Sequence, residues 1–238
     1  MRLLRGDGPL IRIGHRGAGA LAPPNSAAAI EAALEAGVDM VELDVVALPD
    51  GTVALGHSPT ELGSSVDEAF ALVAQSEKTT LLVDVKKPGY ESLLVDALRR
   101  HGLVKRAVAS SGQVEVLEAL RRAEPALVRG RTYPHDRFRL GRRRTLVPAA
   151  GPTLRAVRAA LPRRIGRLLA QADAQVATLQ HRVVSRATVE RCHARGAAVF
   201  AWTVNDRGAL ERLDRLGVDG IITDDPRVFA AAGATLKA

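Results

Sequence analysis

The sequence has one cysteine, few aromatic residues and no long apolar run. Cys192 has no second cysteine to pair with, so an internal disulfide and a thiolate metal cluster are excluded. Aromatic residues make up 3% of the chain, so alanine, valine and leucine must fill the core. No stretch is long enough for a membrane span, and the N-terminal residues lack the apolar run of a secretion signal. We therefore expect a soluble, cytoplasmic protein.

Acidic residues are also absent between Asp136 and Asp173, where arginines accumulate from Arg137 to Arg167. The net charge of +8 fits nucleic-acid binding, attraction to an anionic membrane or steering of an anionic substrate, and composition does not choose among them. Only Tyr133 and Phe138 are nearby, so an aromatic platform for stacking nucleic-acid bases is missing, and we expect no nucleic-acid partner. The arginine run is either a solvated helix face or loop, or a surface that contacts phospholipid headgroups.

Short apolar segments alternate with helical patterns along most of the chain. The expected strands are 11–14, 40–46, 52–56, 80–85, 107–110, 126–130, 174–179, 197–204 and 220–223. The expected helices are 27–36, 66–75, 90–100, 113–122, 186–194, 206–215 and a last one that Pro226 opens. This alternation predicts a parallel sheet, and a chain of 238 residues favours a closed (β/α)8 barrel over a doubly wound sheet. We expect residues 1–238 to form one domain.

Acids and histidines stand at the ends of the first three of these strands. His15 follows the first, Glu42 and Asp44 lie within the second, and His57 closes the third. A strand sends residues i and i+2 to the same face, so Glu42 and Asp44 enter the same space. Carboxylate oxygens suit a hard divalent cation, and imidazoles transfer protons near neutral pH. The stretch therefore indicates metal-assisted hydrolysis.

Short motifs follow one another in order from residue 15 to residue 224. They are His15-Arg16-Gly17, Pro23-Pro24-Asn25-Ser26, Gly37-Val38-Asp39 with Glu42 and Asp44, Asp50-Gly51, His57-Ser58, Leu82-Val83-Asp84-Val85-Lys86, Ala201-Trp202-Thr203-Val204-Asn205 and Gly217-Val218-Asp219-Gly220-Ile221-Ile222-Thr223-Asp224. In order and spacing this set resembles the signature of the glycerophosphodiester phosphodiesterase family. The resemblance spans nearly the whole chain and implies the same barrel fold.

The resemblance implies an enzyme that hydrolyses a small-molecule glycerophosphodiester to sn-glycerol 3-phosphate and an alcohol. Glu42, Asp44 and Asp84 are then the ligands of a divalent ion, Mg²⁺ or Ca²⁺. His15 and His57 flank the phosphodiester. We expect His15 to be the base towards a glycerol hydroxyl or a water, and His57 to protonate the departing alkoxide, although the two roles could be exchanged.

Three further residues are candidates for substrate contact. Arg16 and Lys86 either offset the charge of the phosphate or serve as counter-ions to the three acids. Trp202 either forms a wall of the site or packs in the core. In a (β/α)8 barrel the active site lies at the C-terminal ends of the strands, where these candidates fall.

The sequence departs from the family pattern at a few places. Pro24 and Ser58 replace two acids, and Asp84 stands where the family usually has the longer glutamate. The segment 58–79 is shorter than the family's usual insertion, which implies a more open mouth. An open mouth also suits membrane lipids, so the alternatives are a lysophospholipase D-like enzyme and a barrel that binds phospholipid or phosphate without catalysis.

Overall fold

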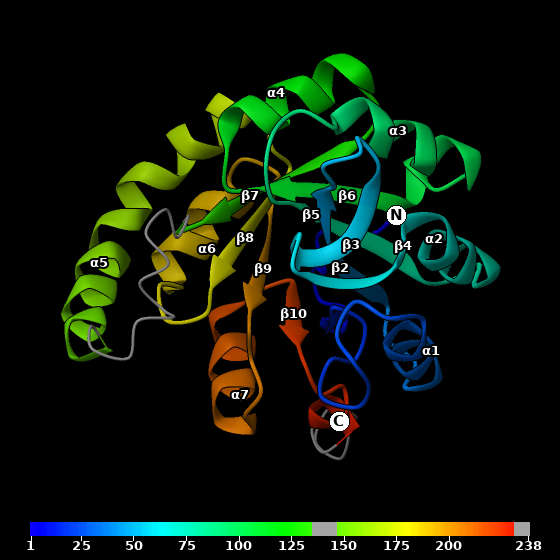
Figure 1. Cartoon of the computed structure of the whole chain (residues 1–238). Coiled ribbons are helices and arrows are strands. Elements are labelled where there is room, and N and C mark those ends of the chain that lie inside the picture. The colour runs from blue at the N-terminus through cyan, green and yellow to red at the C-terminus, as the bar shows by residue number, and fades with distance from the viewer. Residues whose placement is uncertain (135–146, 231–238) are drawn as a thin grey trace.

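The structure is a computed structural model that describes residues 1–134 and 147–230. Its centre is a closed barrel of parallel strands, in which β1 pairs with both β2 and β10 (Figure 1). The barrel strands are β1 (Ile11–His15), β2 (Met40–Ala47), β5 (Thr80–Val85), β6 (Ala107–Ser111), β7 (Val128–Tyr133), β8 (Val176–Gln180), β9 (Ala198–Trp202) and β10 (Gly220–Thr223). The predicted (β/α)8 barrel is confirmed.

Helices connect the strands and surround the barrel. They are α1 (Ala27–Glu35), α2 (Val66–Gln75), α3 (Glu91–Arg100), α4 (Val114–Ala123), α5 (Val147–Ala172), α6 (Arg186–His193), α7 (Arg207–Leu216) and α8 (Arg227–Ala230), with a 3₁₀ turn at Val104–Arg106. Ser26, Ser65, Ser185 and Asp206 each accept a hydrogen bond from the backbone N–H three residues later. These caps satisfy N–H groups that lack a partner in the first turn, and they fix where the helices begin.

The barrel interior is apolar at one end and polar at the other. The apolar layer consists of Ile11, Ile13, Met40, Leu82, Val108, Val176, Ala198, Phe200 and Ile222. Side chains two apart on a strand share a face, and two residues beyond Met40, Leu82 and Val108 the chain has Glu42, Asp84 and Ser110. The polar end is therefore the C-terminal end of the strands.

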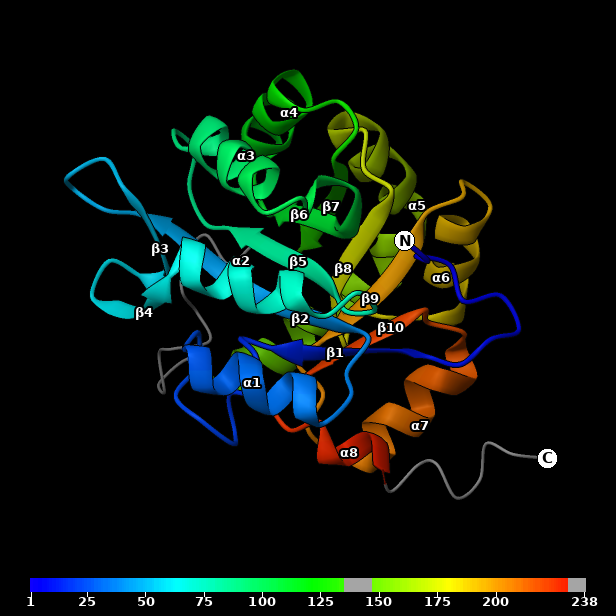
Figure 2. The same ribbon diagram turned by 90° about the vertical axis from the view of Figure 1, so that its right-hand side faces the viewer.

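The last residues of β2 extend beyond the barrel. They pair antiparallel with β3 (Val53–Ser58), which pairs with β4 (Glu61–Ser65), and this hairpin projects past the end where the parallel strands finish (Figure 2). The sequence pattern did not predict β4, because its residues are mostly exposed and include glycine and serine. A Cβ on Gly63 would collide with the carbonyl oxygen of Asn25, so glycine lets β4 lie against the loop after β1.

Helix α5 covers a segment for which the sequence analysis assigned no helix bounds, although a solvated helix face was one interpretation of its arginines. Leu161, Ile165 and Leu169 lie four residues apart and pack into the core. Pro152 and Pro162 lie inside this helix and obscure the pattern, because proline normally ends or bends a helix. Among the described residues we find no helix with both the length and the hydropathy to span a membrane.

The structure describes only part of the arginine run. Residues 137–144 lie outside the described residues, and so does His135. The arginines of α5, all exposed, are Arg155, Arg158, Arg163, Arg164 and Arg167. In this part the run is an exposed helix face.

Candidate active site

A cavity of about 500 Å³ opens at the C-terminal end of the barrel strands. The residues selected from the sequence all line it: His15, Arg16, Glu42, Asp44, His57, Asp84, Lys86 and Trp202. They come from β1, β2, β3, β5 and β9 or from the residue or two that directly follow these strands. The barrel thus brings together side chains that are distant in the sequence.

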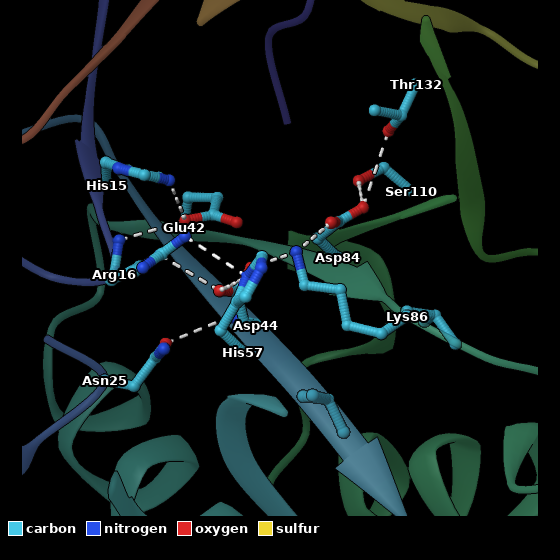
Figure 3. Close-up of polar contacts among 12 residues, drawn as sticks. His15, Arg16, Asn25, Glu42, Asp44, His57, Asp84, Lys86, Ser110 and Thr132 are labelled. Atoms are coloured by element: carbon cyan, nitrogen blue, oxygen red, sulfur yellow. Dashed lines mark hydrogen bonds and ion pairs between the residues drawn. The ribbon is translucent and has the colours of Figure 1, made fainter. Parts of the chain in front are cut away.

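Three carboxylates meet at the centre of the cavity. Glu42 and Asp44 are alternate residues of β2, and β2 pairs with β5 so that Asp44 stands beside Asp84. One oxygen of each carboxylate lies within 4.8 Å of the other two (Figure 3). Glu42 is 5% exposed and Asp44 is 1% exposed. Negative charges this close and this buried repel one another unless cations or protons compensate.

Basic side chains surround Asp44. Lys86 Nζ lies 2.5 Å from Asp44 Oδ1 and 2.5 Å from Asp84 Oδ2, so one ammonium bridges two carboxylates. Arg16 Nε and His57 Nδ1 lie 3.0 Å and 3.2 Å from Asp44 Oδ2. Burial would raise the pKa of Asp44, but these partners outweigh burial and lower it. Burial would likewise lower the pKa of Lys86, and the carboxylates raise it, so both groups are charged at neutral pH.

Glu42 lacks comparable compensation. Burial, reinforced by the charge of Asp44, raises the pKa of Glu42 to about 7. Its Oε2 accepts a hydrogen bond of 2.9 Å from the Arg16 backbone N–H and lies 3.9 Å from His15 Nε2. A cation shared by the three carboxylates would remove the cost of ionising Glu42, and Mg²⁺ and Ca²⁺ prefer oxygen ligands. The donor set therefore fits a hard divalent cation.

Asp224 and Asn205 hold His15. Nδ1 of His15 lies 2.5 Å from Asp224 Oδ1, and because a carboxylate accepts, we assign the ring proton to Nδ1. Asn205 Nδ2 donates to Asp224 Oδ2 at 2.6 Å, and Asn205 Oδ1 accepts from the Asp224 backbone N–H at 2.9 Å. Burial would lower the pKa of His15, but Glu42 and Asp224 outweigh it and raise the pKa. The neutral ring keeps Nε2 as its basic nitrogen.

His57 is anchored through the same ring nitrogen. Its Nδ1 lies 3.2 Å from Asp44 Oδ2 and 3.2 Å from Arg16 Nη2. Asp44 can only accept from Nδ1 and the Arg16 guanidinium can only donate to it, so the two contacts are hydrogen bonds of different tautomers, and the tautomer that accepts from Arg16 carries its proton on Nε2. Its side chain is 35% exposed, against 16% for His15, so His57 stands nearer to the solvent.

Two loops place Arg16 and Lys86. Arg16 and Asn25 have left-handed backbones, with φ of 53° and 61°. Asn25 N–H donates to the Arg16 carbonyl at 2.9 Å, and Asn25 Oδ1 accepts from the Asp44 N–H at 3.0 Å, which ties the first loop to β2. Tyr90 donates its hydroxyl to a β2 carbonyl at 2.6 Å and accepts from the Lys86 N–H at 3.1 Å. These bonds fix the backbone on which both cations stand.

The opposite side of the cavity carries hydroxyls and an indole. Ser110 Oγ and Thr132 Oγ1 donate to Asp84 Oδ1 at 3.1 Å and 3.4 Å, and Thr132 Oγ1 lies 2.7 Å from Thr178 Oγ1. Trp202 lines the cavity wall and also packs on the apolar layer of the barrel. Its Nε1–H is enclosed and has no hydrogen-bond acceptor in the described part of the chain. That N–H is a donor for which a ligand could supply the acceptor.

A sequence profile of the glycerophosphoryl diester phosphodiesterase family matches residues 15–86 and 91–228. The chain belongs to this family. It is thus a phosphoric diester hydrolase by family. A glycerophosphodiester phosphodiesterase from Caldanaerobacter subterraneus subsp. tengcongensis is 26% identical over 255 residues, covering 91% of this chain and 95% of the relative.

Solved structures share the fold. A glycerophosphodiester phosphodiesterase from Parabacteroides distasonis has a TM-score of 0.73 at 18% identity, covering 94% of this chain and 98% of that one. An Oleispira antarctica phosphodiesterase in complex with the product sn-glycerol-3-phosphate has a TM-score of 0.72 at 20% identity, covering 95% and 97%. At these identities the likeness shows that the barrel is common to this chain and to both proteins.

Two departures from the family pattern occupy different places. Pro24 is exposed and does not line the cavity. Ser58 does line it, and its Oγ lies 3.0 Å from Thr60 Oγ1. The cavity of this family member is therefore without a carboxylate at position 58, and its central acids are the three described above.

Sequence reasoning quoted Asn205 and Asp224 as motif residues but gave them no role. It also passed over Ser110 and Thr132, the penultimate residues of β6 and β7, and Thr178 in the middle of β8. A general signal was available, because side chains at the C-terminal ends of all strands of a (β/α)8 barrel converge on one mouth. Applied to every strand of this family member, that rule also selects Ser110 and Thr132, whereas Thr178 is recognised only from the structure.

Proposed function

We propose that this protein hydrolyses glycerophosphodiesters to sn-glycerol 3-phosphate and an alcohol. The observation that carries the proposal is the convergence of three carboxylates and two carboxylate-anchored histidines in one cavity. The Oleispira antarctica phosphodiesterase of the same fold was solved with sn-glycerol-3-phosphate as its product, which supports the same product here. We further propose that residues 1–238 act as one domain.

Glu42, Asp44 and Asp84 would hold the divalent cation, with Mg²⁺ and Ca²⁺ as the candidates. When bound, such a cation polarises a phosphoryl oxygen as a Lewis acid. The three oxygens that lie within 4.8 Å of one another are the support for this assignment. Arg16 and Lys86 add positive charge beside the same carboxylates, and in the proposed reaction they also offset the charge of the phosphate.

His15 is the proposed base. Asp224 accepts from its Nδ1–H, so Nε2 is free to take the proton of the attacking group, a glycerol hydroxyl or a water. His57 is the proposed acid, because its more exposed side chain stands where a departing alcohol can leave. Attack by the glycerol hydroxyl would give a cyclic phosphate, which ³¹P NMR of the reaction mixture would detect.

Trp202 is the proposed contact on the other wall. Its enclosed Nε1–H has no acceptor within the described residues, so an oxygen of the substrate would satisfy it. In Trp202→Phe we expect the KM to rise several-fold and kcat to change little, because the substitution removes the donor and keeps an apolar wall.

A thermal shift measurement tests the metal assignment. Mg²⁺ or Ca²⁺ should raise the melting temperature of the wild type above its value in chelator, because a ligand stabilises the state that binds it. Asp44→Asn should abolish the increase. A wild type that melts at the same temperature with and without both cations would contradict the assignment.

A leaving-group comparison separates the two histidines. Nitrophenolate needs no proton to depart, so His57→Ala should regain activity on a glycerophospho-p-nitrophenol substrate but not on glycerophosphocholine. His15→Ala should stay impaired on both substrates. If His15→Ala, and not His57→Ala, recovered activity on the p-nitrophenol substrate, His15 would be the acid and His57 the base.

Membrane contact through the Arg137–Arg167 region remains a proposal. The described arginines that support it are exposed on α5, and the rest of the region lies outside the described residues. Flotation with phosphatidylglycerol vesicles at low salt tests it on the variant Arg163→Gln/Arg164→Gln/Arg167→Gln.

A cytoplasmic location stays a prediction of the sequence. No specific observation favours the lysophospholipase D-like or non-catalytic alternatives, and we do not propose them.

A further inference from the structure

A second hollow lies between α5 and the start of α6. It has a volume of about 320 Å³ and is lined by Arg155, Arg158, Ala159, Pro162 and Ser185. We call it the arginine groove. Ser185 belongs to the loop between β8 and α6, which lies at the same end of the barrel as the catalytic cavity. None of its lining residues lines that cavity.

A third arginine, Arg212 of α7, interacts electrostatically with Arg158 of the groove. Arg212 Nη2 donates to the carbonyl oxygen of His181 at 3.1 Å, whereas Arg212 Nη1 is enclosed and has no hydrogen-bond partner among the described residues. Burial and the charge of Arg158 both lower the pKa of Arg212, so the two guanidinium groups repel each other. An anion near these like charges would reduce their repulsion and could accept from the unused donor.

The described chain offers little negative charge at this place. Residues 147–172 include no acid, and Asp173 is paired with Arg129 at 2.8 Å. Asp206 opposes the charge of Arg212 from a distance, and its Oδ1 is used as the cap of α7. Within the described residues the side chains of Arg155 and Arg158 make no hydrogen bond or ion pair. Arg155 and Arg158 are thus without an ion-pair partner among the described residues, and Asp206 offsets the effect of burial and Arg158 on Arg212 only in part.

We propose that the arginine groove binds a phosphate group, with Arg155, Arg158 and Arg212 as its donors. Guanidinium groups match phosphate because their N–H groups form paired, charge-assisted hydrogen bonds with its oxygens. Helices α5, α6 and α7, which supply the site, lie along one side of the barrel (Figure 1). A phosphate held there would belong either to a free phosphate ester or to a phospholipid headgroup presented at the open end of the barrel.

The groove is coupled to the catalytic wall through one backbone bond. His181, whose carbonyl accepts from Arg212, donates its N–H to the carbonyl oxygen of Trp202 at 2.8 Å. The groove and the catalytic cavity share no lining residue, so a phosphate bound in the groove would lie outside the cavity. The proposal does not depend on the catalytic assignment, because no residue of the groove takes part in the proposed hydrolysis.

The first test is a titration with inorganic phosphate in chelator, at pH 6 and constant ionic strength. It is monitored by ¹⁵N NMR of the arginine Nε–Hε groups. Saturable shifts of the Arg158 and Arg212 signals are expected. Arg155→Gln/Arg158→Gln should weaken phosphate binding at Arg212 about tenfold or more, since charge-assisted bonds are lost. The control Arg121→Gln/Arg122→Gln removes the same charge from exposed positions on α4 and should bind as the wild type does. Phosphate in the catalytic cavity would instead shift the Arg16 signal.

The second test uses vesicles of phosphatidylcholine with and without phosphatidylglycerol. If the phosphate comes from lipid, the groove variant floats with anionic vesicles less than the control does, even where inorganic phosphate gives no saturable shift. Both groove positions are exposed, so the variant should melt as the wild type does. The proposal is overturned if inorganic phosphate produces no saturable shift at Arg158 and Arg212 and if the two double variants also float equally.

Discussion

The two sides of the catalytic cavity present different chemistry. The side built from β1, β2, β3 and β5 carries the histidines, the carboxylates, Arg16 and Lys86, and we call it the charged side. The side built from β6 to β9 carries Ser110, Thr132, Thr178 and Trp202, and we call it the neutral side. In Figure 3 Ser110 and Thr132 lie beyond Asp84, apart from the cluster around Asp44.

The difference lies in how much each group depends on its neighbours. On the charged side Asp44 is almost fully buried and meets Lys86, Arg16 and the ring of His57, so removing one of the two cations leaves its charge less compensated. On the neutral side Thr132 and Thr178 share a hydrogen bond between uncharged hydroxyls. Substitutions on the charged side should therefore cost far more than substitutions on the neutral side.

Asp44→Asn should have the largest effect. The change removes a proposed metal ligand and the counter-ion of Lys86 and Arg16, and we expect kcat/KM to fall roughly a thousandfold or more. Steady-state hydrolysis of glycerophosphocholine at saturating Mg²⁺ measures it. Asp67→Asn, an exposed acid that also pairs with an arginine and a histidine, is the matched control and should keep its activity. A loss of less than tenfold in Asp44→Asn would place the chemistry elsewhere.

Glu42 should make the metal-free protein less stable as the pH rises from about 5 to 7. Its pKa is raised from an ordinary 4.5 to about 7, so in this window the folded chain holds a proton that the unfolded chain has released. Stability then declines with rising pH, by about 2–3 kcal/mol in the free energy of unfolding. Urea unfolding in chelator measures it. His15 titrates nearby, so the comparison with Glu42→Gln isolates the carboxylate, and equal slopes in both proteins would rule out the effect.

Asp224→Asn should have an intermediate effect. The amide cannot hold the His15 ring proton as the carboxylate does, and we expect roughly a 10–100-fold loss in kcat/KM, as for other groups that orient a reacting residue. The pH profile should also shift to lower pH, because Asp224 helps to raise the pKa of His15. Asp225→Asn is the control, since Asp225 pairs with exposed Arg227. An unchanged pH profile with lower activity would indicate a merely structural role.

Thr178→Val should have the smallest effect. It removes one hydroxyl from the neutral side at nearly constant volume, which costs about 0.5–1.5 kcal/mol, or less than about tenfold in kcat/KM. Thr80→Val, at the opposite end of the barrel, is the control and should leave kcat and KM unchanged. If Thr178→Val lost as much activity as Asp44→Asn, the division between the two sides would be wrong.

The charged side could be selected from the sequence, because its residues lie in short motifs at strand ends. The period of a strand places Glu42 and Asp44 on one face, and parallel pairing adds Asp84. The bond from His15 to Asp224 could not be derived in the same way, because these residues come from the first and last strands and meet only when the barrel closes. The bridge that Lys86 makes between two carboxylates also depends on side-chain positions that no pattern encodes.

The fold could be predicted where apolar periodicity and turn chemistry agree. β7 is the clearest exception, since it begins and ends later than expected. Its residues include Arg129 and Arg131, which are buried here, although arginine at such positions normally indicates a loop. Arg129 is accommodated because it donates to carbonyl oxygens at the base of the barrel and pairs with Asp173. A tertiary partner of this kind is invisible in a local pattern.

The release of sn-glycerol 3-phosphate from glycerophosphocholine tests the proposed reaction most directly. It should be measured with chelator, with Mg²⁺ and with Ca²⁺, on the wild type and on His15→Ala. We predict release by the wild type that requires a divalent cation and falls by roughly 10²–10⁴-fold in His15→Ala. Release that is equal in chelator, or equal in the two proteins, would contradict the roles proposed for the carboxylates and for His15.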